Sequence, residues 1–271
     1  KEAIKVNCKR LLIMAIPQVY YSNNWYNLFE HNTREILMKK IGLVTSGGDA
    51  PGMNAAIRAV TRIAWSKGLT VLGFERGWDG IINNRFKELN PRNVGGILHL
   101  GGTILRTSRS PEFRKPEGLR RAKNNLLLNE VDGLVVIGGD GSMRGAYELS
   151  KESELVVIGI PATIDNDVYG TEETIGFDSA VNTAVVEIDK IRDTANSHDR
   201  VFIVEVMGRK RGFLALTIGL NVGAEVILVP EFEYTLDSVV ETLMENDAKG
   251  KKSGIIVVAE GFGDTKKLAK D

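Results

Sequence analysis

The chain of 271 residues carries 35 basic and 35 acidic side chains, so its formal net charge is zero at pH 7. This balance argues against a protein that binds nucleic acid or a membrane surface through bulk charge. The single cysteine, Cys8, excludes a disulfide framework and a CxxC zinc site and is typical of a reducing cytosol. No apolar run reaches the roughly 18 residues of a membrane span. We therefore expect a cytoplasmic protein with neither nucleic-acid nor membrane partners.

Residues 1–37 differ in composition from the rest of the chain. Glycine makes up 29 of the 271 residues, above the typical usage of roughly 7%, yet none lies in this segment. Met38 then opens a stretch that is typical of a first strand. We interpret Met38 as the native start and residues 1–37 as upstream read-through; a genuine N-terminal extension is the alternative.

From Met38 onward, short apolar runs alternate with helical periods. Seven runs are typical of strands buried on both faces: 41–45, 70–74, 134–137, 155–160, 201–206, 226–229 and 255–259. One amphipathic helix is marked by Ile57, Val60, Ile63 and Ala64. Another is marked by Val181, Ala184, Val185, Ile188 and Ile191, with Asp178 as its expected N-cap. The pattern predicts an α/β protein of two parallel, doubly wound sheets with helices on both faces, divided into domains at 38–176 and 177–271.

Two glycine-rich strings follow predicted strands, where ligands of such sheets bind. Gly47 and Gly48 lie between a strand and a helix, so backbone N–H groups there can approach an anion. The run 138–142, Gly-Gly-Asp-Gly-Ser, adds a carboxylate at Asp140 that can hold Mg²⁺. The alternative for either string is a tight turn.

Carboxylates and arginines follow other strands. Asp165 and Asp167 lie two residues apart at a predicted strand end, where one can accept a proton and the other can orient its neighbour. Read alone, Asp-Asn-Asp is more often a turn. Arg106, Arg109 and Arg114 fall within nine residues of sequence near glycine-rich turns, which suits phosphate, although exposed arginines are usually solvated.

Together these strings resemble the bacterial-type ATP-dependent 6-phosphofructokinases, the phosphofructokinase A family. The matching segments are 45–54 (TSGGDAPGMN), 138–142 (GGDGS), 161–167 (PATIDND), 197–200 (SHDR) and 204–209 (VEVMGR), in family order and at family spacing. The resemblance covers residues 38–271 and implies a C-terminally truncated chain whose second domain is incomplete. It also implies that the 271 residues alone are inactive, because a further sugar-phosphate clamp would follow Asp271.

The resemblance implies phosphoryl transfer from MgATP to the 1-hydroxyl of fructose 6-phosphate, a step of glycolysis, in a homotetramer. ATP would be held by Gly48, Arg109, Ser110, Gly139, Asp140, Gly141 and Ser142, with Mg²⁺ on Asp140. Asp165 would be the base, assisted by Arg209 and Thr163. The sugar phosphate would meet Thr163, Ile164, Asp165, Met207, Gly208, Arg209 and Glu260, and Arg200 would reach that of a neighbouring subunit.

An allosteric site is also implied, for a nucleoside diphosphate such as ADP or for phosphoenolpyruvate. Its residues would be Arg58, Arg62, Arg192, Gly223, Glu225, Lys249, Lys251, Lys252 and Ser253. Arg58 and Arg62 are four apart on one helix face, which by itself is more often a solvated pair. Pro91 and Gly96 stand where Arg and Asp are common in the family, so the identity of the effector stays open.

Three alternatives remain. Pyrophosphate-using relatives carry Asp where Gly141 stands and Lys where Ala162 stands, and the small residues here favour ATP. Other kinases with a Gly-Gly-Asp-Gly loop, such as lipid or NAD kinases, lack the strings around Asp165 and Arg209. A non-catalytic nucleotide-sensing relative would not need Asp140, Asp165 and Arg209 together.

Overall fold

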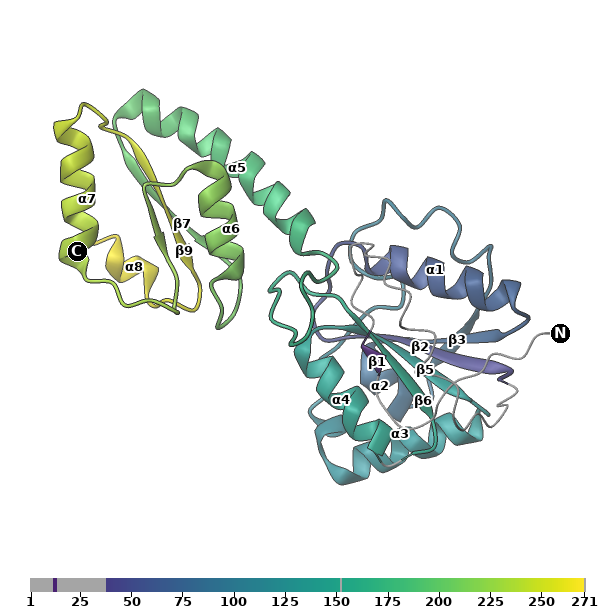
Figure 1. Ribbon diagram of the computed structural model, residues 1–271. Coiled ribbons are helices and arrows are strands. Elements are labelled where there is room, and N and C mark those ends of the chain that lie inside the picture. The colour runs from purple at the N-terminus through teal and green to yellow at the C-terminus, as the bar shows by residue number, and fades with distance from the viewer. Residues whose placement is uncertain (1–11, 14–37, 152, 271) are drawn as a thin grey trace, which may run out of the picture. The chain divides into compact units, whose positions relative to one another are not determined.

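The computed structural model describes residues 12–13, 38–151 and 153–270 (Figure 1). The interpretation of residues 1–37 falls almost entirely outside them. The described chain forms two units. The first extends to Thr163 and includes Val168–Ile175; the second consists of Ile164–Asp167 and the chain from Gly176 onward. The chain therefore passes between the units three times. The four residues Ile164–Asp167 belong to the second unit, although the residues on either side of them belong to the first.

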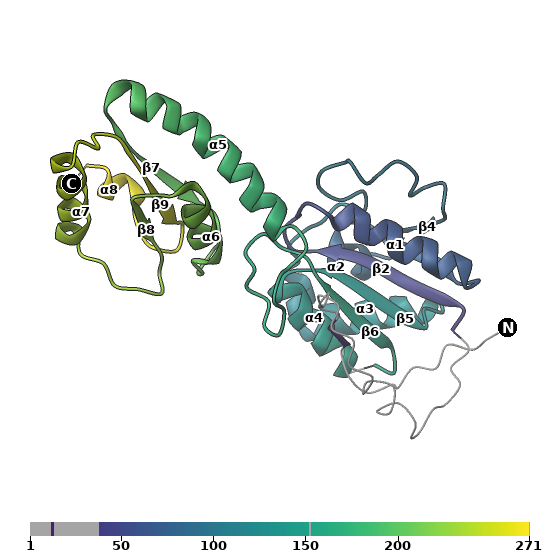
Figure 2. The ribbon, with the colours of Figure 1, turned by 45° about the horizontal axis from the view of Figure 1, so that its top comes forward.

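The first unit is built on a six-stranded sheet in the order β1-β6-β5-β2-β3-β4. Its strands are β1 (Leu12–Ile13), β2 (Lys40–Ser46), β3 (Thr70–Phe74), β4 (Phe86–Leu89), β5 (Gly133–Gly138) and β6 (Val156–Pro161). All neighbours pair in parallel except β3 and β4. Figure 2 shows β2, β5 and β6 running side by side. Their carboxyl ends share one edge, which is where the glycine-rich strings begin.

Helices cover both faces of this sheet. They are α1 (Met53–Ser66), α2 (Gly77–Ile82), α3 (Pro116–Leu128), α4 (Asp140–Lys151) and the short 3-10 helix η2 (Glu112–Arg114). In Figures 1 and 2, α1 lies on one face and α2, α3 and α4 on the other. The core under α2–α4 centres on Trp78 and Phe113, whose rings stack with centroids 4.1 Å apart. Burial of such large rings is worth several kcal/mol, on the order of 25 cal/mol per Å² of apolar surface.

The second unit is smaller, with a parallel sheet in the order β7-β9-β8. Its elements are α5 (Phe177–His198), β7 (Val201–Val206), α6 (Phe213–Val222), β8 (Val226–Leu228), α7 (Leu236–Ala248), β9 (Gly254–Ala259) and α8 (Thr265–Leu268). One face of the sheet packs under α5 and α6, and the other under α7 and α8. Strand β9 is buried throughout, as its uninterrupted apolar sequence predicts. Among the described residues, no helix combines the length and apolar character needed to cross a bilayer.

All seven predicted strands are confirmed to within one or two residues, and the α/β class with helices on both faces is confirmed. Three expectations were wrong. The predicted helix face at 57–64 buries Ile57 and Ala64, but Ile63 is 63% exposed because it lies beyond the buried stripe. The cap of α5 is Gly176, at φ 105°, and Asp178 lies inside the first turn. The sheet is not wholly parallel, since β4 forms an antiparallel edge.

Gly138 offers a first test of the fold. A Cβ atom there would lie 2.4 Å from the Ser46 carbonyl oxygen and 2.7 Å from the Ser142 hydroxyl. Gly138→Ala is therefore expected to lower the free energy of unfolding by roughly 1–3 kcal/mol, as overpacking does. Gly48→Ala is the matched control, because a Cβ at Gly48 would meet nothing within 4 Å. Urea unfolding of both variants checks this; equal stabilities would contradict it.

Candidate active site

The loop between β2 and α1 is shaped by glycines in left-handed backbone conformations. Gly47 has φ 92° and Gly52 has φ 88°, a region that residues with side chains seldom adopt. Between them, Gly48 is exposed and has open space around its missing side chain. A ligand can therefore approach the backbone at Gly48 closely, just before the N-terminus of α1, where anions are favoured.

The second glycine-rich string forms the N-terminus of α4. Asp140 is the first residue of the helix, and a Cβ at Gly141 would meet nothing within 4 Å. The hydroxyl of Ser142 is buried and donates to the carbonyl oxygen of Ser46, 2.8 Å away. Ser142 therefore joins the α4 loop to the end of β2, and its side chain faces inward. The open space at Gly48 and at Gly141 suits the approach of phosphate groups.

Arg109 and Ser110 lie in the loop that precedes η2. Arg109 is exposed, as a residue that binds a ligand from solvent should be. Ser110 is buried, and its hydroxyl accepts the Phe113 N–H at 3.3 Å. The side chain of Ser110 therefore caps the local turn, whereas the charged side chain of Arg109 is accessible to a ligand.

Asp140 has the chemistry that a nucleotide-bound magnesium ion requires. Its carboxylate is 30% exposed and pairs with the guanidinium of Arg144 one turn later, at 3.0 Å. Because Mg²⁺ usually takes one or two carboxylates together with phosphate oxygens and waters, a single accessible Asp fits this role. Arg144 is 79% exposed and can release the carboxylate. No cluster of three or more His, Cys, Asp or Glu side chains suited to a metal occurs in the part of the chain that the structure describes.

In the second unit, Arg209 lies beside both predicted carboxylates. Its Nη1 is 3.4 Å from Asp167 Oδ2, and its Nε is 3.9 Å from Asp165 Oδ2. The carboxylates are 8% and 16% exposed, whereas Arg209 is 59% exposed. Between them, Asn166 adopts φ 52°, a conformation that Asn tolerates better than most residues. The half-exposed cation of Arg209 thus faces one buried carboxylate, Asp165, and one partly buried carboxylate, Asp167.

Other predicted sugar-site residues lie at the carboxyl ends of β7 and β9. Met207 follows β7 and is 58% exposed, and Gly208 has φ 136°. Glu260 follows β9, and its N–H donates to the Val206 carbonyl oxygen at 2.9 Å. A Cβ at Gly261 would lie 2.4 Å from the Arg209 carbonyl oxygen, so glycine is needed there. The structure thus brings these residues to the strand ends beside Arg209.

Thr163 and Ile164 mark a passage between the units. Thr163 belongs to the first unit, where its carbonyl oxygen accepts the Thr174 hydroxyl at 2.6 Å. Ile164 belongs to the second unit and packs against the core under α5 and α6. This packing of Ile164 helps to fix Asp165, its neighbour, in the second unit.

Arg200 lies apart from these residues in the same chain. It directly precedes β7, whereas Met207–Arg209 follow the strand. Six residues of strand span roughly 20 Å, which is beyond the reach of an arginine side chain. Within one chain, Arg200 therefore does not belong to the cluster around Asp165 and Arg209.

The predicted effector residues form two groups, one in each unit. In the first, Arg58 and Arg62 lie on α1. In the second, Glu225 lies at the centre: its carboxylate, 2% exposed, pairs with Lys251 and lies 3.9 Å from Arg192. Arg192 also donates to the Val222 carbonyl oxygen. Of the others in this unit, Gly223 caps α6 at φ 60°, Ser253 donates to Asn196, Lys249 pairs with Glu245, and Lys252 is exposed.

The pKa of Glu225 lies below its usual value of 4.5. Burial acts in the opposite direction, but the ion pair with Lys251 and hydrogen bonds from the backbone N–H groups of Ile255 and Glu225 outweigh it. The lowered pKa contributes stability that is present above pH 4.5 and is lost as the pH falls through the lower native value.

Glu225→Gln is therefore expected to lower the stability of the second unit by about 1–3 kcal/mol at pH 7, because it weakens a buried charged interaction. The difference from the parent protein should shrink as the pH falls from 4.5 through the lowered native pKa of Glu225, below which both proteins carry a neutral side chain. Glu241→Gln, on the exposed side of α7, is the control. Thermal unfolding from pH 3 to pH 7 measures the effect, and a pH-independent difference would contradict it.

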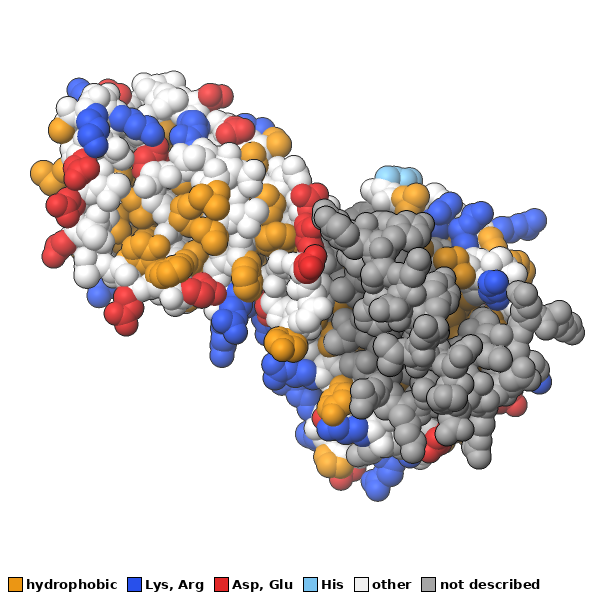
Figure 3. Space-filling model, in the orientation of Figure 1, with side chains coloured by type: hydrophobic (Ala, Val, Ile, Leu, Met, Phe, Trp, Pro, Cys, Tyr) orange, Lys and Arg blue, Asp and Glu red, His pale blue; other side chains and the backbone are white. Residues whose placement is uncertain are grey.

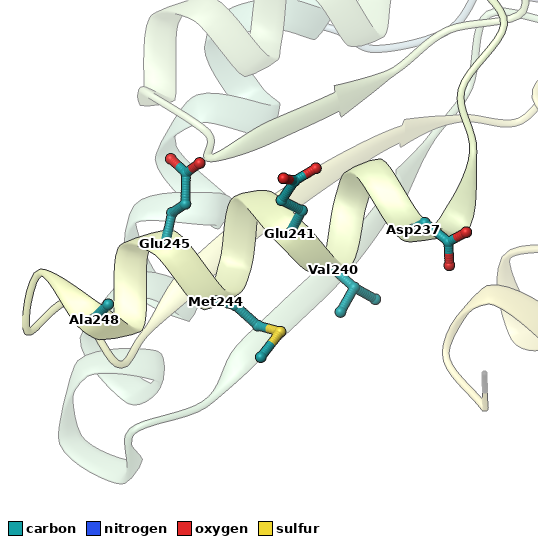
Figure 4. Close-up of a pocket in the computed structure, with 6 residues that line it drawn as sticks. All are labelled: Asp237, Val240, Glu241, Met244, Glu245 and Ala248. Atoms are coloured by element: carbon teal, nitrogen blue, oxygen red, sulfur yellow. The ribbon is translucent and has the colours of Figure 1, made fainter.

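A hollow lies along α7. Figure 4 shows Glu241 and Glu245 pointing to one side of α7 and Val240 and Met244 to the other, with Asp237 and Ala248 nearer its two ends; all six residues line the hollow. Three carboxylates four residues apart repel phosphate. The hollow is therefore unsuited to the anionic ligands that the glycine-rich loops accept.

The partners of several site residues were not identified from the sequence. The pairing of Asp140 with Arg144 follows i,i+4 spacing and was visible there. The pairing of Arg209 with Asp167 joins residues that are 42 apart in sequence, so no local sequence pattern predicts it. The buried hydroxyl of Thr45 donates to the Arg106 carbonyl oxygen at 2.9 Å and is equally non-local.

The known proteins to which this chain is similar include phosphofructokinases. The phosphofructokinase family model matches residues 40–271. The ATP-dependent 6-phosphofructokinase of Persephonella marina is 53% identical over 232 residues, which cover 86% of this chain and 72% of that protein. The ATP-dependent 6-phosphofructokinase 1 of Thermus thermophilus is 56% identical over 224 residues, which cover 83% of this chain and 70% of that protein.

Solved structures agree with these relatives. The phosphofructokinase of Saccharomyces cerevisiae superposes with a TM-score of 0.77 at 40% identity, covering 85% of this chain and 34% of that one. The chain thus spans about a third of the yeast protein's length. A pyrophosphate-dependent phosphofructokinase from Marinobacter aquaeolei shares the fold, with a TM-score of 0.73 at 22% identity. On the family match and these identities, the chain belongs to the phosphofructokinase family.

Proposed function

We propose that the protein transfers the γ-phosphoryl group of ATP to the 1-hydroxyl of fructose 6-phosphate, giving fructose 1,6-bisphosphate in the glycolysis of the cytoplasm. The observation that carries the proposal is the buried Asp165 carboxylate beside Arg209, in a chain whose relatives at more than 50% identity are named ATP-dependent 6-phosphofructokinases. A carboxylate that follows a parallel strand is well placed to act on a ligand at that edge.

Groups of the first unit would bind the nucleotide and its metal ion. Backbone N–H groups at Gly48 and around Gly139–Ser142 hold the nucleotide phosphates, and Arg109 adds a positive charge. Asp140 would hold the Mg²⁺ ion, which neutralises charge on the phosphates when bound. Phosphoryl transfer depends mostly on positioning and charge neutralisation, so the protein need supply little covalent chemistry.

Asp165 accepts the proton of the sugar 1-hydroxyl as that oxygen attacks the γ-phosphorus, whose bond to the β-phosphate oxygen breaks so that ADP leaves. Arg209, between Asp165 and Asp167, holds the carboxylate in place and offers positive charge to the developing transition state. Thr163, Ile164, Met207, Gly208 and Glu260 line the sugar side.

We further propose a homotetramer in which Arg200 serves a neighbouring subunit. Support comes from its place before β7, opposite to the Arg209 end of the strand. Figure 3 shows apolar side chains gathered on one side of the second unit, and α6 exposes Phe213, Leu216 and Leu220 at helical spacing. Such a patch suits coverage by another protein surface. The residues around Glu225 and those on α1 are the proposed effector site for ADP or phosphoenolpyruvate.

A coupled assay on the full gene product tests the function. Fructose 6-phosphate is offered with MgATP, with Mg-pyrophosphate or with neither, and formation of fructose 1,6-bisphosphate is followed. The proposal predicts turnover with ATP and at least tenfold less with pyrophosphate. Turnover with pyrophosphate alone would overturn the choice of donor, and no bisphosphate with either would overturn the function.

A further inference from the structure

Two threonine hydroxyls join the loop that carries Arg109 to the end of β2 and to the loop that follows it, which carries Gly48. Thr107 Oγ1 donates to the Gly47 carbonyl oxygen at 2.9 Å, and Thr45 Oγ1 donates to the Arg106 carbonyl oxygen at 2.9 Å. Both bonds join segments about 60 residues apart in sequence but adjacent in the first unit. Each tie ends on a backbone carbonyl next to a proposed phosphate-binding residue or within a few residues of it.

The bond from Thr45 holds backbone that would not adopt its conformation readily by itself. Arg106 has φ 58°, in the left-handed region, whereas Gly47, at φ 92°, adopts that region without strain. An arginine seldom takes that conformation without support from its surroundings. Thr45 is fully buried, and a buried hydroxyl without a hydrogen bond is energetically costly. The Thr45 hydroxyl also lies within hydrogen-bond distance of Thr103 Oγ1, 3.0 Å away.

A second anchor fixes the same loop from the side of α2. The Ser108 hydroxyl lies 2.7 Å from Asp79 Oδ2 and 2.7 Å from the Arg76 carbonyl oxygen. Residues 106, 107 and 108 are thus each held by a side-chain hydroxyl, whereas Arg109, the next residue, is exposed. Hydrogen bonds therefore hold the three residues before Arg109, and the exposed Arg109 side chain extends from them.

We propose that Thr45 and Thr107 are positioning residues for nucleotide binding, which hold Arg109 and the Gly48 backbone in register on the same phosphate group. The inference rests on the proposed function, because it takes ATP as the ligand of this site. The inference goes beyond that function because it assigns the relative position of Arg109 and the Gly48 backbone to the hydroxyls of Thr45 and Thr107. A misplacement of about 1 Å in a charged contact can cost a large factor in rate or affinity.

The proposal distinguishes positioning from ordinary stabilisation through a double-mutant cycle. Thr107→Val keeps the shape of the side chain and removes the hydrogen bond. If Thr107 acts by placing Arg109, the loss of nucleotide affinity should appear in the parent protein and nearly vanish once Arg109 is Ala. If Thr107 only stabilises the fold, the two backgrounds should lose affinity equally.

The experiment measures the dissociation constant of MgATP by titration calorimetry on the full gene product, without sugar, in a square of parent, Thr107→Val, Arg109→Ala and the double variant. We expect Thr107→Val to raise the constant about five- to tenfold in the parent, the effect of one lost hydrogen bond, and less than about twofold in the Arg109→Ala background. Thr107→Ser should restore affinity. In turnover assays, KM for ATP should rise while KM for fructose 6-phosphate stays unchanged.

Thr183→Val is the matched control, because its hydroxyl also donates to a backbone carbonyl, that of Ser179, but within α5 of the second unit. Should Thr107→Val fail to fold, Thr107→Ala takes its place in the same square. Weakened binding in Arg109→Ala with unchanged binding in Thr107→Val, or equal losses in both backgrounds, would overturn the inference and leave the function standing. No ATP binding by the parent would overturn both.

Discussion

Replacing Asp165 with Asn is expected to lower kcat by about 10²–10⁴-fold, the usual contribution of general-base catalysis. Asn has the shape of Asp but cannot accept the proton of the sugar hydroxyl. The dissociation constant of MgATP should change less than about threefold, because the nucleotide loops lie in the first unit and Asp165 belongs to the second. Steady-state kinetics and titration calorimetry on the full gene product measure the two quantities.

Asp237→Asn serves as the control for the loss of one negative charge, since Asp237 lies in the hollow of α7. It should leave kcat unchanged. A loss of ATP affinity in Asp165→Asn as large as its loss of kcat would assign Asp165 to metal binding or to the fold. Unchanged kcat would remove it from the mechanism altogether.

Replacing Gly141 with Asp is the second change with a large expected effect. The added carboxylate would stand at the N-terminus of α4, where the nucleotide phosphates are proposed to bind. Like charges brought together cost several kcal/mol, so kcat/KM for ATP should fall by at least about 100-fold. Stability should change little, because a Cβ at Gly141 meets nothing within 4 Å and an acidic residue suits the first turn of a helix.

Gly141→Ala separates charge from size in this experiment. It should keep most of the activity with ATP, since the position has room for a methyl group. Kinetics and urea unfolding of both variants provide the test. An equal loss of activity in Gly141→Ala and Gly141→Asp would mean that crowding, and not charge, governs the site.

The fold could be predicted from the sequence where burial is uniform along an element. Strand β9, apolar throughout, was identified by its composition alone. Strand β4 was not, because Lys87 and Glu88 interrupt it; its place at the sheet edge allows such residues. Ile63 shows the complementary error, an apolar residue that lies on the exposed side of α1.

The sequence allowed prediction of those site residues that lie shortly after a strand. Asp140, Asp165 and Met207–Arg209 each follow a parallel strand, and the sequence shows where those strands end. The partners of these residues could not be predicted, because the contacts of Arg209 with Asp167 and of Thr107 with Gly47 depend on how distant loops meet. For Arg200, the sequence predicts the separation from Arg209, because β7 lies between the two residues.

Transfer of ³²P from γ-labelled ATP tests the central claim most directly. The full gene product and its Asp165→Asn variant are incubated with labelled ATP, Mg²⁺ and fructose 6-phosphate, and the position of the label is determined. The account predicts label at the 1-phosphate of fructose 1,6-bisphosphate with the parent and at least about 100-fold slower labelling with the variant. Label released only as free phosphate, or equal labelling by the two proteins, would contradict it.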